Sequence, residues 1–160
     1  MNKVLVGMGD FKISKVPDTL MTIGLGSCLG VCIFDQSAKV AGMAHIMLPT
    51  SRYMPHNNPM KYADTCLSMM LNEIDKVGGN RLRLKAKIAG GAQMFATHDD
   101  ISAMHIGEKN MVAVSAELKK YGIPIVSQDV GGNVGRTITF HIATSELHIK
   151  TARSDNFKVI

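Results

Sequence analysis

Apolar and polar residues alternate along the chain in short runs, and this pattern predicts more strand than helix. Most runs end at glycine, asparagine or serine clusters, as strands closed by turns do. The stretches expected to form strands are Lys3–Met8, Thr19–Leu25, Leu29–Phe34, Lys39–Leu48, Leu82–Ala89, Pro124–Val130, Arg136–Ala143 and Glu146–Arg153. The turn-like composition of residues 35–38 predicts that the third and fourth of these strands form a hairpin.

Two segments have the periodicity of helices. The first extends from about Lys61 to Val77 and ends at Gly78-Gly79, a typical helix stop. Its expected buried face consists of Ala63, Cys66, Leu67, Met70, Leu71 and Ile74. The second begins near Gly107 or Glu108 and ends at Tyr121-Gly122, and its expected buried residues are Val112, Ala116 and Leu118.

The connections between neighbouring strands are too short for parallel crossovers, so we expect an α+β fold rather than a doubly wound one. We find no internal repeat, low-complexity segment or linker, which predicts a single domain over residues 1–160. Hydrophobic residues make up 46% of the chain and charged residues 19%, a balance that favours a packed core over disorder.

The amino-acid composition restricts the cellular location and the binding partners that we expect for the protein. No apolar run approaches the roughly 20 residues of a membrane span. The three cysteines are an odd number, which does not suit a framework of paired disulfides. We therefore expect a cytoplasmic protein without membrane insertion. The net charge is +5, but the only dense basic cluster, Arg81–Lys87, alternates with apolar residues as a half-exposed strand does. Without tryptophan and with 5% aromatic residues, nucleic-acid binding is not expected, whereas an acidic protein partner is compatible with the charge.

Candidate chemistry centres on the segment Gly24-Leu25-Gly26-Ser27-Cys28. The two glycines permit a sharp turn, and N–H groups left unpaired beside the sulfur would favour a thiolate. The backbone N–H groups of Ser27 and Cys28 would also stabilise an oxyanion. The plainer interpretation is that Cys28 is a small core residue, which is how we interpret Cys32 and Cys66.

A reactive thiol needs a base, and His45 is the candidate. The predicted hairpin sets Cys28 opposite the region of His45, to within one or two residues. A histidine in an apolar strand is more often a hydrogen-bonded core residue than a catalyst. Thr22 is near enough in sequence to orient the imidazole, although the spacing alone does not favour it over Thr19 or Ser27.

Other constellations are weaker. Cys28, Cys32, His45 and His56 lack the paired spacing of a zinc site, and the glycine-rich stretch 131–135 lacks the lysine of a phosphate-binding loop. We expect no metal and no organic cofactor. The stretch around Gly91, Ala92, Met94 and Phe95 ends a strand with apolar residues in a glycine-rich setting, which indicates either core or an exposed docking edge for a partner or substrate.

With these residues in view, the sequence resembles the CheD family of bacterial chemotaxis proteins. The matching segments run in family order through most of the chain: residues 22–28, 44–49, 61–64, 87–95, Ile106-Gly107 with Asn110, and 129–136.

The resemblance implies hydrolysis of particular glutamine side chains of chemotaxis receptors to glutamate, which tunes signalling, with Cys28, His45 and Thr22 as a catalytic triad. It also implies layered β-sheets flanked by helices, as in the cytotoxic necrotizing factor deamidase toxins. The implied partners are the receptors, as substrates, and the CheC phosphatase. The alternative is a binding module that acts through CheC, with an incidental or vestigial hydrolase site.

Overall fold

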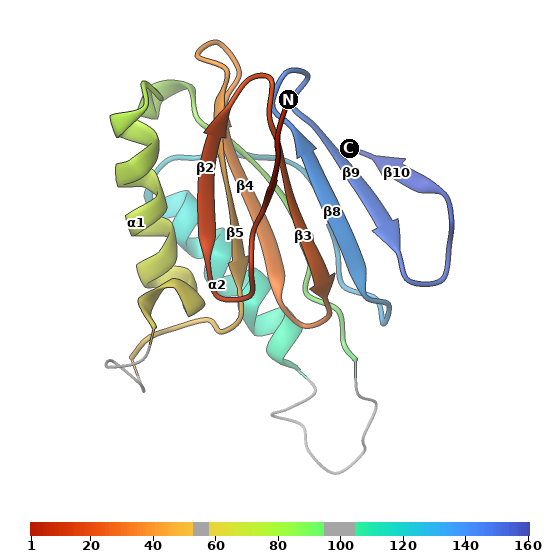
Figure 1. The fold of residues 1–160 in the computed structure, drawn as a ribbon. Coiled ribbons are helices and arrows are strands. Elements are labelled where there is room, and N and C mark those ends of the chain that lie inside the picture. The colour runs from red at the N-terminus through yellow and green to blue at the C-terminus, as the bar shows by residue number, and fades with distance from the viewer. Residues whose placement is uncertain (53–57, 95–104) are drawn as a thin grey trace.

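The computed structural model describes residues 1–52, 58–94 and 105–160. These residues form two five-stranded sheets and two α-helices (Figure 1). The strands are β1 (Lys3–Leu5), β2 (Phe11–Lys15), β3 (Thr19–Leu25), β4 (Leu29–Asp35), β5 (Val40–Ile46), β6 (Lys85–Gly90), β7 (Ile125–Val130), β8 (Arg136–His141), β9 (Glu146–Thr151) and β10 (Phe157–Val159). The helices are α1 (Ala63–Lys76) and α2 (Ile106–Lys120), and short 3-10 turns cover Pro59–Lys61 and Arg81–Arg83.

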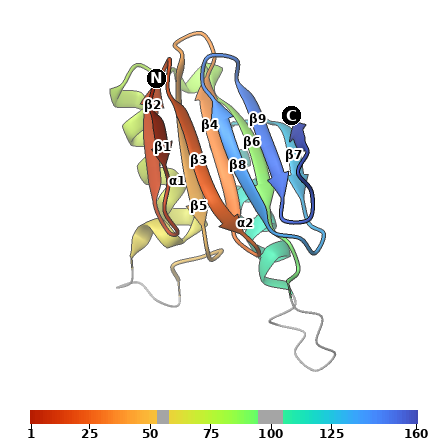
Figure 2. The same ribbon diagram turned by 45° about the vertical axis from the view of Figure 1, so that its right-hand side comes forward.

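The elements stack in three layers. A central sheet with the order β2-β5-β4-β6-β7 is covered on one face by both helices and on the other by an outer sheet with the order β1-β3-β8-β9-β10 (Figures 1 and 2). The pairs β6–β7 and β1–β3 are parallel, and the other pairs are antiparallel. The parallel pair β6–β7 needs a long crossover, which α2 supplies. The expected α+β class with layered sheets flanked by helices is confirmed.

Two apolar cores lie between the layers. One lies between the helices and the central sheet, and α1 contributes to it the six residues expected from the sequence. The other lies between the two sheets and includes Cys32, Met43 and Phe140. Because β4 and β5 lie in the middle layer, all fourteen of their residues are buried. Burial on both faces explains why the residues of these strands, apart from Asp35 and His45, are apolar or glycine at successive positions rather than alternating with polar ones.

The largest departures from the sequence-based prediction are two strands and one helix face. The short strands β2 and β10 were not predicted: β2 has only intermediate and exposed positions, and all three residues of β10 are exposed, so neither has a strong apolar signature. The buried face of α2 was wrong in phase. Val112 is 60% exposed and Ala116 is exposed, whereas Leu118 is buried as expected, together with Gly107, Asn110 and Val114, which were not predicted.

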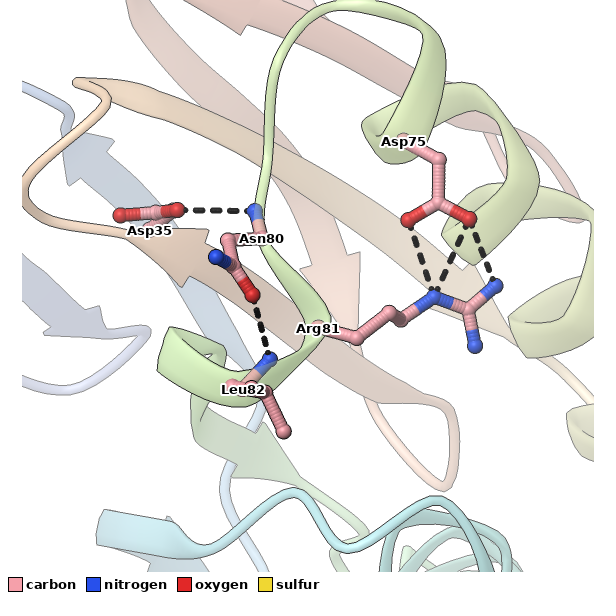
Figure 3. A network of polar contacts seen from close by, with 5 residues as sticks. All are labelled: Asp35, Asp75, Asn80, Arg81 and Leu82. Carbon is pink, nitrogen blue, oxygen red and sulfur yellow. Dashed lines mark hydrogen bonds and ion pairs between the residues drawn. The ribbon is translucent and has the colours of Figure 1, made fainter.

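The carboxylate of Asp35 joins the β4–β5 turn to the connection that precedes β6. It accepts hydrogen bonds from the backbone N–H groups of Ala38 (3.0 Å) and Asn80 (2.9 Å) and from the guanidinium of Arg83 (2.9 and 3.1 Å). Figure 3 shows the Asn80 contact, beside the exposed Arg81–Asp75 pair. Burial alone would raise the pKa of Asp35, but these donors outweigh it and lower the pKa to about 2.

We predict that Asp35→Asn lowers the free energy of unfolding at pH 7 by about 1–3 kcal/mol, because buried donors lose their charged acceptor. The pKa of Asp35 is lower in the folded protein than in the unfolded chain. The stabilisation is therefore complete above about pH 4 and is lost as the pH falls toward 2. Urea unfolding between pH 2 and 7 should show the gap between wild type and variant closing in acid.

Asp75→Asn is the matched control, because Asp75 pairs with Arg81, which lies in the same 3-10 turn as Arg83, and this pair is exposed to solvent. This substitution should cost at most about 1 kcal/mol. A pH-independent gap for Asp35→Asn, or an equal loss for both variants, would contradict the role given to the buried carboxylate.

Candidate active site

Cys28 lies where the chain passes from the outer sheet to the central sheet, in the three-residue connection between β3 and β4. The main chain that follows β6 holds this connection. The Gly91 N–H donates to the Cys28 carbonyl (2.9 Å), and the Ala92 N–H donates to the Gly26 carbonyl (2.8 Å). Backbone bonds on both sides of Ser27 fix the connection without using any side chain.

Gly90 allows this close approach. It has a φ of +116°, and a Cβ atom built on it would lie 2.4 Å from the Cys28 carbonyl oxygen. Its own carbonyl accepts bonds from the Gly131 N–H (2.9 Å) and from the Arg136 guanidinium (3.2 Å), and Arg136 also pairs with Asp129 (3.2 Å). The end of β6 is therefore held on both sides, with the Cys28 segment against it.

Cys28 is half-buried and packs against the apolar core between the sheets. Burial raises the pKa of its thiol. Such a thiol needs an adjacent acceptor for its proton. Cys32 and Cys66 are fully buried, as expected, and burial raises the pKa of Cys66 to about 12. All three cysteines are free.

His45 lies on β5 with its ring directed between the two sheets. It is fully buried and pairs across the ladder with Gly30, two residues after Cys28. Cys28 packs against the core between the sheets and the His45 ring contacts Thr22 of the outer sheet, so both side chains lie on the same side of the central sheet. The expectation that the hairpin brings them to within one or two residues is confirmed. Burial lowers the pKa of His45, which keeps the imidazole neutral at pH 7.

The Thr22 hydroxyl joins the two sheets. Its Oγ1 lies 2.8 Å from His45 Nδ1 and 2.7 Å from the Val6 carbonyl oxygen. A carbonyl can only accept, so the single hydroxyl hydrogen goes to Val6 and Thr22 Oγ1 must accept from Nδ1–H. This arrangement assigns the proton of the neutral ring to Nδ1 and leaves a lone pair on Nε2. Among the described residues, Nε2 has no hydrogen-bond partner.

The Ser27 and Cys28 N–H groups meet the first requirement for an oxyanion site, which is to be unpaired. In the part of the chain that the structure describes, neither donates a hydrogen bond. The peptide that joins them is held from the other side: Asn110 Nδ2 donates to the Ser27 carbonyl (3.0 Å). The apolar pattern of the sequence predicted no role for Asn110. The signal that could have found it is a polar residue on an otherwise apolar helix face.

Only part of the stretch that we expected to dock a partner or substrate lies at the surface of the described structure. Gly91 and Ala92 are buried, so they offer no surface to a partner, and their N–H groups instead hold the Cys28 connection. Met94 is 44% exposed and covers Gly26, where an added Cβ would meet its side chain at 3.1 Å. Phe95, like His56 of the alternative zinc set, lies outside the described residues.

The chain is similar to several known proteins. Residues 47–151 match the model of a family described as CheD chemotactic sensory transduction. The chain is 49% identical to the probable chemoreceptor glutamine deamidase CheD of Desulfitobacterium hafniense, over 94% of each chain. It is 48% identical to the chemoreceptor glutamine deamidase CheD of Halalkalibacterium halodurans, over 94% of this chain and 95% of that one. Among solved structures, Neisseria meningitidis protein NMB0706 matches 81% of this chain and 64% of its own, with 9% identity and a TM-score of 0.48.

The fold and the site together define an α+β protein in which a thiol, an imidazole and a hydroxyl gather between two sheets. Thr22, Cys28 and His45 precede the residues that the family model matches. The alignment with the Desulfitobacterium hafniense relative covers 94% of the chain and includes all three, because each lies well inside the ends of the chain. The chain belongs to the CheD family.

We predict that Gly90→Ala lowers the free energy of unfolding by roughly 1–3 kcal/mol and slows the reaction of Cys28 with iodoacetamide. Both effects follow from the positive φ and the clash with the Cys28 carbonyl. Gly122→Ala is the matched control, since Gly122 also has a positive φ (+70°) but open space around its Cβ position. Thermal unfolding and alkylation rates measure the two effects. Equal alkylation rates in both variants would show that the close contact does not position the thiol.

Proposed function

We propose that this protein hydrolyses glutamine side chains of chemotaxis receptors to glutamate, with Cys28 as nucleophile, His45 as general base and acid, and Thr22 as the group that orients His45. The names of the relatives support the substrate class. The observation that carries the chemistry is the Thr22–His45 hydrogen bond, which leaves the Nε2 lone pair free on the side of the sheet where the Cys28 thiol lies.

The first half of the reaction forms a thioester. His45 Nε2 takes the thiol proton as the sulfur attacks the side-chain amide carbon, and the carbonyl oxygen becomes an oxyanion. The Ser27 and Cys28 N–H groups stabilise that charge. The imidazolium then returns its proton to the amide nitrogen, because an unprotonated amide nitrogen leaves poorly, and the carbon–nitrogen bond breaks to release ammonia.

The second half restores the enzyme. Water enters the place that ammonia has left, and neutral His45 takes a proton from it as the oxygen attacks the thioester carbon. The carbon–sulfur bond breaks, the proton passes back to sulfur, and the product is a glutamate side chain. Thr22 accepts from Nδ1–H throughout and stabilises the imidazolium as an uncharged third member of the triad. These residues supply every proton transfer, so the proposal involves neither a metal nor an organic cofactor.

We also propose a cellular location and binding partners for the protein. Three free cysteines are compatible with a cytoplasmic protein. Among the described residues, no helix is long and apolar enough to cross a membrane. We propose the receptors' cytoplasmic segments as substrates and CheC as a regulatory partner. Met94, exposed and seated on Gly26 next to the Cys28 connection, is the described residue best placed to contact either of them.

Mass spectrometry of a receptor cytoplasmic fragment tests the reaction. After incubation with the protein, defined glutamines should each gain about one mass unit and release one ammonia, as hydrolysis through a cysteine acyl-enzyme requires. Cys28→Ala should abolish the change, whereas Cys32→Ala, which removes a thiol buried in the core, should not. No change on cognate receptors with folded wild-type protein would favour the CheC-binding module instead.

Substitutions of Thr22 test the orienting role. Thr22→Ser keeps the hydroxyl and should retain most of the activity. Thr22→Val leaves Nδ1–H without its acceptor and should lower kcat by roughly 10- to 100-fold, which is less than the full effect of losing general acid–base catalysis. Thr22→Ala should likewise lower turnover less than Cys28→Ala does. The measurement is the rate of ammonia release, and equal losses in Thr22→Ala and Cys28→Ala would count against the orienting role.

A further inference from the structure

Asn110 is a buried polar residue that contacts both strands of the site. Its Nδ2 donates to the carbonyl of Ser27, just before the proposed nucleophile, and to the carbonyl of Met47, two residues after the proposed base (both 3.0 Å). The side chain is fully buried. One amide nitrogen on α2 therefore joins the start of β4 to the end of β5, the two ends that hold Cys28 and His45.

Gly107 brings Asn110 within reach. A Cβ at Gly107 would lie 2.5 Å from the Gly91 carbonyl oxygen and 2.7 Å from that of Ala92, so only glycine lets α2 approach the end of β6 this closely. Asn110 follows three residues later, on the same helix face. The close approach and the two hydrogen bonds fix the rotation of α2, which explains why Asn110 rather than Val112 faces inward.

The identity of the side chain fits this contact. A carboxamide nitrogen carries two hydrogens and can serve two carbonyls, whereas an aspartate oxygen would repel both. Oδ1, in contrast, is buried and has no partner among the described residues. The two hydrogen bonds of Asn110 are therefore both made by its nitrogen.

The Ser27–Cys28 peptide is trans and planar, so its C=O and N–H point in opposite directions. Asn110 holds the C=O toward α2. The Cys28 N–H is consequently directed away from α2, and it is one of the two N–H groups that have no acceptor in the described structure. Fixing the carbonyl thus fixes the direction of the donor.

We propose that Asn110 is a positioning residue that orients the Cys28 N–H toward the oxyanion formed during hydrolysis. The inference rests on the proposed function, because it assigns a means of transition-state stabilisation to that site. Asn110 acts through the Ser27–Cys28 peptide and does not touch the substrate. Its loss should therefore slow the step in which charge develops on oxygen, and it should leave ground-state binding and the thiol itself largely unchanged.

The test compares Asn110→Ala and Asn110→Ser with Val114→Ala on the same receptor fragment. Val114 is buried one turn further along α2, so its truncation loosens the helix without touching Ser27. For Asn110→Ala, kcat should fall by roughly 10²- to 10³-fold, as for the loss of one oxyanion donor, with KM within about 2-fold of wild type. Asn110→Ser, which keeps one donor, should give an intermediate loss. Val114→Ala should retain a kcat close to that of wild type.

Alkylation of Cys28 by iodoacetamide separates this role from a structural one, because displacement of iodide by sulfur forms no oxyanion. The alkylation rate of the Asn110 variants should stay within about 2-fold of wild type while their kcat falls. A parallel fall in both rates would show that Asn110 merely keeps the site folded, and an unchanged kcat in either variant would also overturn the proposal.

Should Asn110→Ala fail to fold, Asn110→Ser by itself decides between these outcomes. A wild-type protein that deamidates nothing would refute the proposed function and this inference together. An active wild type with fully active Asn110 variants would refute the inference alone.

Discussion

Burial of β4 and β5 on both faces is the constraint on which the rest of this structure depends. Strands in a middle layer have apolar neighbours above and below, so a polar side chain on them must find a partner inside the protein. Asp35 finds three donors at one end of the hairpin. His45, near the other end, finds one partner among the described residues, and it does so by reaching across to the outer sheet.

That single partner gives the site its chemical character. Because Thr22 gives its hydrogen to Val6, it can only accept from His45 Nδ1, and the other imidazole nitrogen, Nε2, has no partner in the part of the chain that the structure describes. The same burial keeps the ring neutral and the Cys28 thiol protonated. The proposed nucleophile and the proposed base are therefore both uncharged at rest, and charge is expected to appear only as a substrate reacts. A site of this kind depends on positioned donors for the developing oxyanion more than on a preformed thiolate.

The proposed oxyanion donors lie in a connection that is held by main-chain contacts and by the side chain of Asn110. Gly90, Gly91 and Gly107 let the end of β6, the Cys28 connection and the start of α2 approach one another closely. The Asn110 side chain then joins α2 to the Cys28 connection by a hydrogen bond. The apolar cores hold these segments in layers, while the glycines set the close distances between them. The catalytic groups proposed here thus come from both sheets and from the connection between them, and Asn110 of α2 contacts that connection.

The sequence by itself determined the secondary structure of the interior and the candidates for the chemistry. Periodicity was sufficient for α1, whose six predicted buried residues are all buried, and for the β4–β5 hairpin, whose turn sets Cys28 two residues from the partner of His45. It was insufficient for β2 and β10, which have little apolar pattern because they lie at sheet edges.

Only the tertiary structure decided the contacts between layers. Thr22 was one of several nearby hydroxyls in the sequence, and the packing of one sheet on the other selected it. The rotation of α2 depended on a glycine contact and two hydrogen bonds to distant carbonyls, so the apolar pattern of the helix gave the wrong phase and concealed Asn110. Periodicity registers which face of an element is apolar, but it carries no information about which residue of another element meets that face.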